Sequence, residues 1–400
     1  MRILLVEPWY GGSHRAWADG WAVASSHDID MVTLPDRFWR RRLRVGAAEL
    51  APLVDQWVDR HGRPDVVVAT SMVELAALLG SCRRSLGEVA VVLYCHENQL
   101  VYPHPDQVAA PDVDAAARSL QSLTVADLVV VNSRHHLDEL GIGARRVIRD
   151  LGLAGGAVDR RVAAALDAAI VVPVGVDLSW CGAAGDVPEG GGPAPDHSRD
   201  DRPEPDGAAD DRPDAGSGDP VVLWPHRWDG DKAPDAMVRT LERLAADGVA
   251  FRVVLAGEDG WDGEARRREA LERLGPRVLA SGHLSPGDYR RWVRRADIVV
   301  STARHEYFGV AVVEAMAAGC VPVLPDRCSY PELVPAELHT AALYPDGGFG
   351  RQLRRVLTDL PAARAGVAGL AQALTRFDRD AVSSDLDAVV AGVALRCRGC

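Results

Sequence analysis

The sequence predicts an α/β protein made of two Rossmann-like domains that face a central cleft. Short, nearly continuous apolar runs alternate with helical patterns along the chain, which is typical of a buried parallel sheet covered by helices. This pattern occurs twice, before and after a stretch that is acidic and rich in glycine, proline and alanine. The length of 400 residues also exceeds what a single hydrophobic core usually supports.

The acidic stretch sets the expected boundaries: an N-terminal domain over 1–179, a linker over 180–220, a C-terminal domain over 221–377 and a final helix within 378–400. Between Cys181 and Pro220, eleven acidic residues against three arginines contribute −8 of the net charge of −12. Almost no large apolar side chain occurs there, so the stretch cannot bury enough surface to fold and we expect it to be disordered. The remaining −4 does not argue against a nucleic-acid partner.

The first half begins with a strand at 3–6, a loop containing Gly11 and Gly12, and a helix from Arg15, which is how a Rossmann-like unit opens. Further strands are expected at 28–34, 65–70, 89–95, 127–132 and 170–173. Ligands of parallel sheets bind beyond the carboxyl ends of the strands, where two polar runs lie: Gly11 to His14 and His96 to Gln99 (HENQ). The glycine spacing does not indicate a dinucleotide site. The residues alone leave open whether HENQ binds an acceptor or sugar, or is a capped polar loop.

Residues 37–44 (RFWRRRLR) form a basic segment with two interleaved aromatic side chains. Such a segment can bind phosphates and stack on bases, although solvated amphipathic segments are common in an arginine-rich chain. The candidate RNA-binding residues are Arg37, Arg40, Arg41, Arg42 and Arg44.

The second half repeats the pattern, with strands expected at 221–224, 251–256, 277–280, 297–301 and 320–324. Lys232 is the only lysine among 45 basic residues and follows Arg227 by five positions, in a loop between a strand and a helix. Arginine offers a planar fork to a diphosphate, whereas lysine offers a movable point charge. The pair therefore indicates a phosphate site.

Residues 297–319 predict a strand, a loop and a helix that ends at Gly319. The first amides of that helix, at Phe308, Gly309 and Val310, lack intrahelical partners and can bind an anion. Glu306 in the loop and Glu314 in the helix can accept hydrogen bonds from sugar and ribose hydroxyls, which suits a sugar nucleotide. The residues alone leave equally open a solvated glutamate and one that favours the helix dipole.

Neither a metal nor a cofactor is predicted. Of the seven cysteines, only the C-x2-C at residues 397–400 has ligand-like spacing, and a single pair at a chain end is weak evidence for zinc. No Asp-x-Asp motif lies in a plausible loop. No apolar run approaches the roughly 20 residues of a membrane span, so we expect a cytoplasmic protein with reduced thiols and no membrane partner.

These residues together carry a resemblance to the retaining GT-B glycosyltransferases, through the two halves, Arg227 with Lys232, and Glu306-x7-Glu314 with its Phe-Gly-Val loop. More narrowly, the chain resembles the tRNA-queuosine α-mannosyltransferase family. The similar runs lie at residues 10–14 (YGGSH), 33–39 (TLPDRFW), 96–103 (HENQLVYP), 224–228 (WPHRW) and 305–310 (HEYFGV).

The resemblance implies transfer of mannose from GDP-mannose to queuosine in tRNA-Asp, with retention, without a metal, and with the final helix packed on the first domain. On the donor side, it implies that Arg227 and Lys232 bind the diphosphate, that Glu306 binds the donor sugar and that Glu314 binds the ribose. The amides of Phe308, Gly309 and Val310 would face the phosphates. On the opposite wall of the cleft, Gly11, Gly12 and His14 would shape the surface and His96 would lie near the reacting sugar. The alternatives are a GT-B enzyme with a lipid, glycan or metabolite acceptor, and a non-catalytic protein that binds tRNA or a sugar nucleotide.

Overall fold

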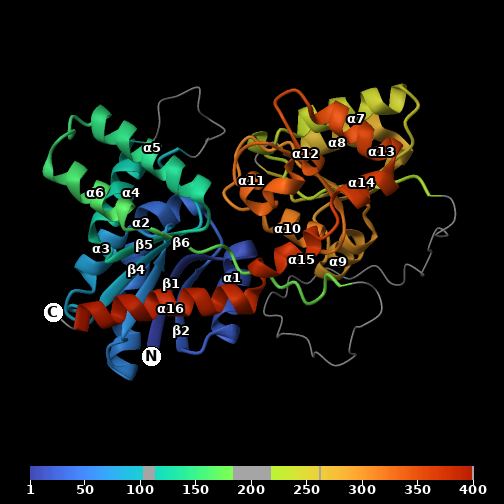
Figure 1. The fold of residues 1–400 in the computed structure, drawn as a ribbon. Coiled ribbons are helices and arrows are strands. Elements are labelled where there is room, and N and C mark those ends of the chain that lie inside the picture. The colour runs from blue at the N-terminus through green and yellow to red at the C-terminus, as the bar shows by residue number, and fades with distance from the viewer. Residues whose placement is uncertain (102–112, 183–217, 261–262, 399–400) are drawn as a thin grey trace.

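The computed structural model describes residues 1–101, 113–182, 218–260 and 263–398, and these form two α/β halves (Figure 1). Each half contains a six-stranded sheet, ordered β2-β1-β3-β4-β5-β6 in the N-terminal half and β12-β11-β10-β7-β8-β9 in the C-terminal half. Neighbouring strands are parallel in both sheets. The predicted architecture of two parallel sheets with helices between the strands is therefore confirmed.

The N-terminal half follows the expected order of strands and helices, although its first strand runs four residues past the predicted end and its first helix begins three residues early. Its elements are β1 (Arg2–Tyr10), α1 (Gly12–Ala24), β2 (Asp28–Pro35), α2 (Trp39–His61), β3 (Val66–Thr70), α3 (Leu75–Ser81), β4 (Ala90–Cys95), α4 (Val113–Val125), β5 (Leu128–Val131), α5 (Arg134–Asp150), α6 (Ala157–Asp167) and β6 (Ile170–Val171). Strands β3, β4 and β5 are buried along their whole length, because helices cover both faces of the sheet.

The C-terminal half repeats this order and adds short helices near its end. Its elements are β7 (Val221–Trp224), a 3₁₀ turn (Gly230–Lys232), α7 (Pro234–Ala246), β8 (Arg252–Ala256), α8 (Gly263–Leu274), β9 (Val278–Gly282), α9 (Pro286–Arg295), β10 (Ile298–Val300), α10 (Val310–Ala317), β11 (Val321–Pro325), α11 (Tyr330–Leu333), α12 (His339–Ala342), β12 (Leu343–Tyr344), α13 (Phe349–Thr358), α14 (Leu360–Gly366), α15 (Leu370–Ala373) and α16 (Arg379–Arg398). The two-residue strand β12 was not expected, because so short a run carries no periodic signal.

The final helix, α16, packs against α1, β3 and β4 of the N-terminal half, and Figure 1 shows it in red along the blue part of the chain. Its anchor is Asp387, which is 6% exposed. The carboxylate accepts hydrogen bonds from Trp21 Nε1 (2.9 Å), Ser25 Oγ (2.6 Å), Ser26 N (2.7 Å) and Ser26 Oγ (2.8 Å). Four donors converge on one carboxylate, so the docking of α16 is specified by polar contacts as well as by its apolar face.

Two crossings of the chain between the halves lie side by side. Val176 N donates to Phe377 O, and Arg379 N donates to Val176 O, both at 2.9 Å, which gives a parallel bridge between Val176 and Asp378. The expected disordered linker falls mainly at residues 183–217, outside the described residues, as does Cys400. No helix in the described ranges combines the length and apolar composition that crossing a bilayer requires.

Candidate functional site

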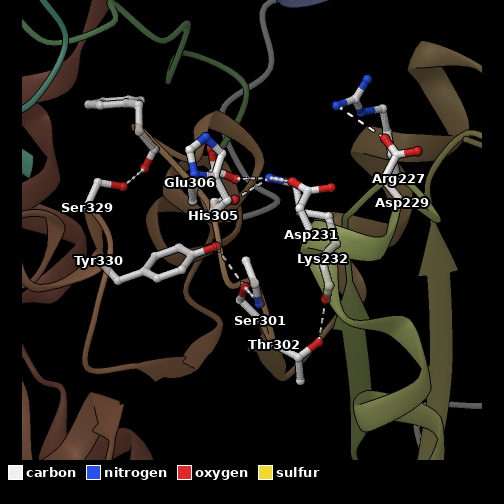
Figure 2. A network of polar contacts seen from close by, with 12 residues as sticks. Arg227, Asp229, Asp231, Lys232, Ser301, Thr302, His305, Glu306, Ser329 and Tyr330 are labelled. Carbon is white, nitrogen blue, oxygen red and sulfur yellow. Dashed lines mark hydrogen bonds and ion pairs between the residues drawn. The ribbon is translucent and has the colours of Figure 1, made fainter. Parts of the chain in front are cut away.

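Lys232 is held at the end of the 3₁₀ turn after β7, facing the loop between β10 and α10 (Figure 2). The side chain is largely buried, and Nζ donates to His305 O (2.8 Å) and to Glu306 Oε2 (3.1 Å). Asp231 Oδ2 lies 3.2 Å from the same nitrogen. Thr302 Oγ1 anchors the turn by donating to Lys232 O (2.8 Å). The structure therefore brings together two predicted site residues, Lys232 and Glu306, from loops 74 positions apart.

Glu306 is kept ionised by its neighbours. Burial alone would raise the pKa of its carboxyl, but the charge of Lys232 and hydrogen bonds from Lys232 and the Phe308 amide hold that pKa below its usual value. The Phe308 amide is thus directed at Glu306. The other two amides predicted to bind an anion, those of Gly309 and Val310, lie at the start of α10. Gly309 is the N-cap residue, with φ of 96°, a left-handed conformation that glycine adopts without strain.

Glu314 lies inside α10, where Oε2 accepts a hydrogen bond from the Tyr289 hydroxyl at 2.7 Å. Burial raises the pKa of the Glu314 carboxyl to about 7, although Tyr289 and Arg290 act in the opposite direction. The guanidinium of Arg290 lies 5.3 Å from the Trp180 ring centroid. The carboxyl predicted to take the ribose therefore lies beside a phenol and near a guanidinium, and both of these groups neighbour the Trp180 ring.

Arg227 follows β7 and is half exposed, with its guanidinium 3.3 Å from Asp229 Oδ2 (Figure 2). The loop that carries it passes close to the end of β8, where a Cβ atom on Gly257 would lie 1.9 Å from His226 O. Only glycine permits this approach. Arg227 also lies near enough to Glu97 of the N-terminal half to lower the pKa of that carboxyl, which burial raises.

On the opposite half, the loop after β1 brings His14 to Glu7. Glu7 is fully buried, and Oε2 lies 3.0 Å from His14 Nδ1. Burial lowers the pKa of His14, but the hydrogen bond and the charge of Glu7 outweigh it, so the net shift is upward. Gly11 caps α1, and a Cβ atom on Gly11 would lie 1.9 Å from Asp36 Oδ2. Gly12 has φ of 51°.

His96 lies directly after β4, and its ring centroid is 4.3 Å from that of His14, 4.5 Å from that of Trp17 and 4.8 Å from that of Tyr94. Burial lowers its pKa well below the usual value, so this imidazole is neutral beside a His14 that holds its proton more strongly. Among the described residues, Glu7, His14 and His96 are the group that could hold a metal ion, with candidate ligand atoms within 4.8 Å of one another. That transfer needs no metal stays a prediction.

The arginines of residues 37–44 do not share one environment. Arg37, Arg40, Arg41 and Arg44 are exposed, whereas Arg42 is 8% exposed. Arg42 binds Glu49 and the carbonyl of Pro35 (3.4 Å), because it lies on the face of α2 that packs on the sheet. Arg42 is thus largely buried in the free protein, unlike its neighbours, and RNA contact by the arginines of this segment stays a prediction. The exposed arginines start beside the Gly11 loop, since Asp36 lies against Gly11.

Comparisons with known proteins agree with this arrangement. A family model described as tRNA-queuosine alpha-mannosyltransferase N-terminal matches residues 2–161, and one described as Glycosyl transferases group 1 matches residues 208–365. Over 343 residues, the chain is 30% identical to tRNA-queuosine alpha-mannosyltransferase of Drosophila melanogaster, across 84% of this chain and 82% of that protein. The chain belongs to the tRNA-queuosine α-mannosyltransferase family.

A partial sequence match and two solved structures of similar fold add to this comparison. A part of the chain is 33% identical over 111 residues to GDP-mannose:cellobiosyl-diphosphopolyprenol alpha-mannosyltransferase of Xanthomonas campestris, across 26% of this chain and 28% of that protein. Sucrose-phosphate synthase of Thermosynechococcus elongatus superimposes with a TM-score of 0.68, at 16% identity, over 99% of this chain and 100% of that one. Anabaena HepE with UDP and glucose gives 0.63, at 17% identity, over 98% and 100%. The fold is GT-B, as predicted, and the chain is a glycosyltransferase.

Several residues of this site were not predicted from the sequence. Glu7 lies inside β1, directly after the predicted strand at 3–6, and a carboxylate at the end of an apolar run is the one signal that could have indicated it. Tyr289, which donates to Glu314, and Asn132, whose Nδ2 donates to His96 O at 3.1 Å, carry no local pattern that indicates these contacts. Tyr307 lies inside the run 305–310, yet its ring stacks on His136 of the other half, and this contact depends on how the two halves meet.

Proposed function

We propose that this family member transfers mannose from GDP-mannose to the queuosine nucleoside of tRNA-Asp, with retention of configuration. Membership of the tRNA-queuosine α-mannosyltransferase family is the observation that carries the proposal, because the similarity to the Drosophila enzyme covers most of both chains. The name of the Xanthomonas relative includes GDP-mannose, which supports the same donor.

On the donor side, the proposed roles follow from charge. Cleavage of the glycosyl–phosphate bond places negative charge on the departing diphosphate, and cations that meet this charge as it develops lower the barrier. Arg227 is half exposed and can bind the diphosphate directly. Lys232 is fixed by three oxygen atoms and keeps Glu306 ionised, so that Glu306 can accept from a hydroxyl of the donor sugar. The amides at the start of α10 complete the anion site.

On the acceptor side, His14 and His96 form the wall beyond the sheet edge, with His14 oriented by Glu7. The exposed arginines of residues 37–44 begin beside this wall and suit the phosphates of a nucleic acid. In this arrangement an acceptor hydroxyl meets the donor sugar near His96, and the leaving phosphate takes its proton, so the reaction requires no protein base. The acceptor oxygen bonds to the anomeric carbon on the face from which the diphosphate departs, so retention requires no protein nucleophile.

Incubation with radiolabelled GDP-mannose and bulk tRNA tests the proposal, in parallel with tRNA from a strain unable to make queuosine. Label that enters only queuosine-containing tRNA, and co-purifies with tRNA-Asp, supports donor and acceptor together. Label in both tRNA samples would refute queuosine as the acceptor. Absence of label in both would refute this donor–acceptor pair, and measuring GDP or UDP release from other sugar nucleotides would then identify the donor.

A salt series tests the basic surface. Replacing Arg37, Arg41 and Arg44 with glutamine should weaken tRNA binding and flatten its dependence on salt. With fewer phosphate contacts, tRNA binding releases fewer counterions. Donor hydrolysis without tRNA should stay unchanged. Replacing the exposed Arg160 and Arg161 on α6 with glutamine is the control for a loss of positive charge elsewhere on the N-terminal half. Equal tRNA affinity in both variants would remove residues 37–44 from the proposal.

A further inference from the structure

Tyr307 connects the donor-side loop with the N-terminal half. It lies between Glu306, whose carboxylate binds Lys232, and Phe308, whose amide binds Glu306. Its side chain is buried, and its ring stacks on His136 with centroids 4.0 Å apart and an angle of 20° between the planes. A face-to-face contact of two buried rings restricts the position of both backbones.

His136 is in turn fixed to the backbone of His96. Its Nδ1 lies 2.9 Å from Asn132 Oδ1, and because a carboxamide oxygen only accepts, Nδ1 carries the proton. Burial, with the charges of His135 and His305, lowers the pKa of His136 to about 3, so the ring is neutral. Asn132 Nδ2 donates to His96 O at 3.1 Å. A continuous set of contacts therefore runs from the His96 backbone to the loop of Glu306.

A second contact between the halves lies on the surface beside this set. The Glu332 carboxylate of α11 accepts hydrogen bonds from the Arg134 amide (2.7 Å) and the His135 amide (2.6 Å) at the start of α5. Figure 1 shows α11 facing the half that contains α5. A carboxylate at the N-terminus of a 17-residue helix meets both the free amides and the positive end of the helix dipole. This contact holds α5, and with it His136, against Tyr307.

We infer that Asn132, His136 and Tyr307 form an interdomain bridge that positions the His96 backbone relative to the Glu306 loop, and that Glu332 keeps the His136 and Tyr307 rings in contact by holding α5 in place. The bridge residues are positioning residues, since none of them is placed against the donor or the acceptor. The inference rests on the proposed function for the roles of His96 and Glu306. Its consequence is that breaking the bridge lowers the rate of transfer while nucleotide binding, which the C-terminal half supplies, is kept.

The bridge is tested with Tyr307→Leu, which removes the ring, and Tyr307→Phe, which keeps it. We expect Tyr307→Leu to lower kcat for transfer about tenfold or more, with the Kd for GDP within about twofold of wild type, and Tyr307→Phe to retain most of kcat. Combining Tyr307→Leu with His136→Leu should lower kcat little more than either change alone, because both changes break the same bridge. Phe349→Leu, which removes a buried ring inside the C-terminal core, controls for loss of packing.

Two results would overturn the inference: a kcat of Tyr307→Leu within twofold of wild type, or a loss of GDP binding as large as the loss of kcat. Should Tyr307→Leu not fold, the exposed Glu332→Gln replaces it, with the exposed Glu337→Gln as control. Small-angle scattering separates this inference from the proposed function, because it needs no substrate. The radius of gyration should rise in Tyr307→Leu or Glu332→Gln and stay unchanged in Tyr307→Phe and Glu337→Gln. An equal radius in all of them refutes the bridge even where wild type transfers no mannose.

Discussion

Replacing Glu314 with glutamine should make the protein more stable at neutral and alkaline pH while weakening nucleotide binding. Burial raises the pKa of this carboxyl from its ordinary 4.5 to about 7. The folded protein therefore retains a proton that the unfolded chain releases, and ionising Glu314 in the folded state costs stability. This cost is absent below about pH 4.5, grows as the pH rises to about 7, and is constant above.

The magnitude follows from the distance between the two pKa values. At about 1.36 kcal/mol for each pKa unit, Glu314→Gln gains about 3 kcal/mol in the free energy of unfolding at pH 8, and less than about 1 kcal/mol at pH 5. Glutamine has the same shape, and its carbonyl oxygen can still accept from the Tyr289 hydroxyl, so the change removes charge and little else.

Urea unfolding at pH 5, 6, 7 and 8 measures this difference, with the exposed Glu264→Gln as a control for the loss of one negative charge. A stability gain that is the same at all four pH values, or absent at pH 8, would show that ionising Glu314 does not destabilise the folded protein. Binding of GDP, measured by calorimetry at pH 8, should be weaker in Glu314→Gln, because an uncharged amide accepts a ribose hydroxyl less strongly than a carboxylate.

Three further substitutions separate binding from stability. Arg227→Ala should lower turnover about 100-fold and leave the melting temperature unchanged, because the side chain is half exposed; turnover near wild type would contradict its diphosphate role. Lys232→Ala should lower turnover and also cost about 3 kcal/mol in urea unfolding, because it leaves Glu306 and Asp231 without their cation; unchanged stability would contradict this. Asp387→Ala should cost about 3 kcal/mol at pH 7, since buried donors lose their acceptor, and a loss below about 1 kcal/mol would show that α16 is held by apolar packing alone.

The fold could be predicted from the sequence because its signals are local. The strand at Val221–Trp224 has the predicted bounds, and most other strands differ from prediction by one or two residues at their ends, whereas β1 continues four residues beyond the predicted end, to Tyr10. Apolar runs bounded by glycine, proline or aspartate specify such strands without reference to the rest of the chain. The two-residue β12 was not predicted, because its pairing with β11, and not its own composition, makes it a strand.

The sequence placed several candidate residues in one half, but it did not indicate the contacts that form between the halves. Lys232 and Glu306 were predicted as separate residues of the donor side, and they meet because each follows a strand at the same edge of one sheet; their roles stay predictions. The orientation of Arg42 could not be read from RFWRRRLR, because in a segment with five arginines the sequence does not show which side chain faces the sheet. Tyr307 and His136 have no sequence signal for each other, since their contact forms only when the halves pack together.

The paired crossings at Val176 and Asp378, together with the anchored α16, have a consequence for a chain that is cut. A break between residues 183 and 217 would leave two fragments that are not independent, because the second fragment still carries the helix that covers the first fragment's sheet. Separately produced fragments should therefore reassemble into a working enzyme, and a protease that cleaves there should leave a particle of unchanged mass until it is denatured.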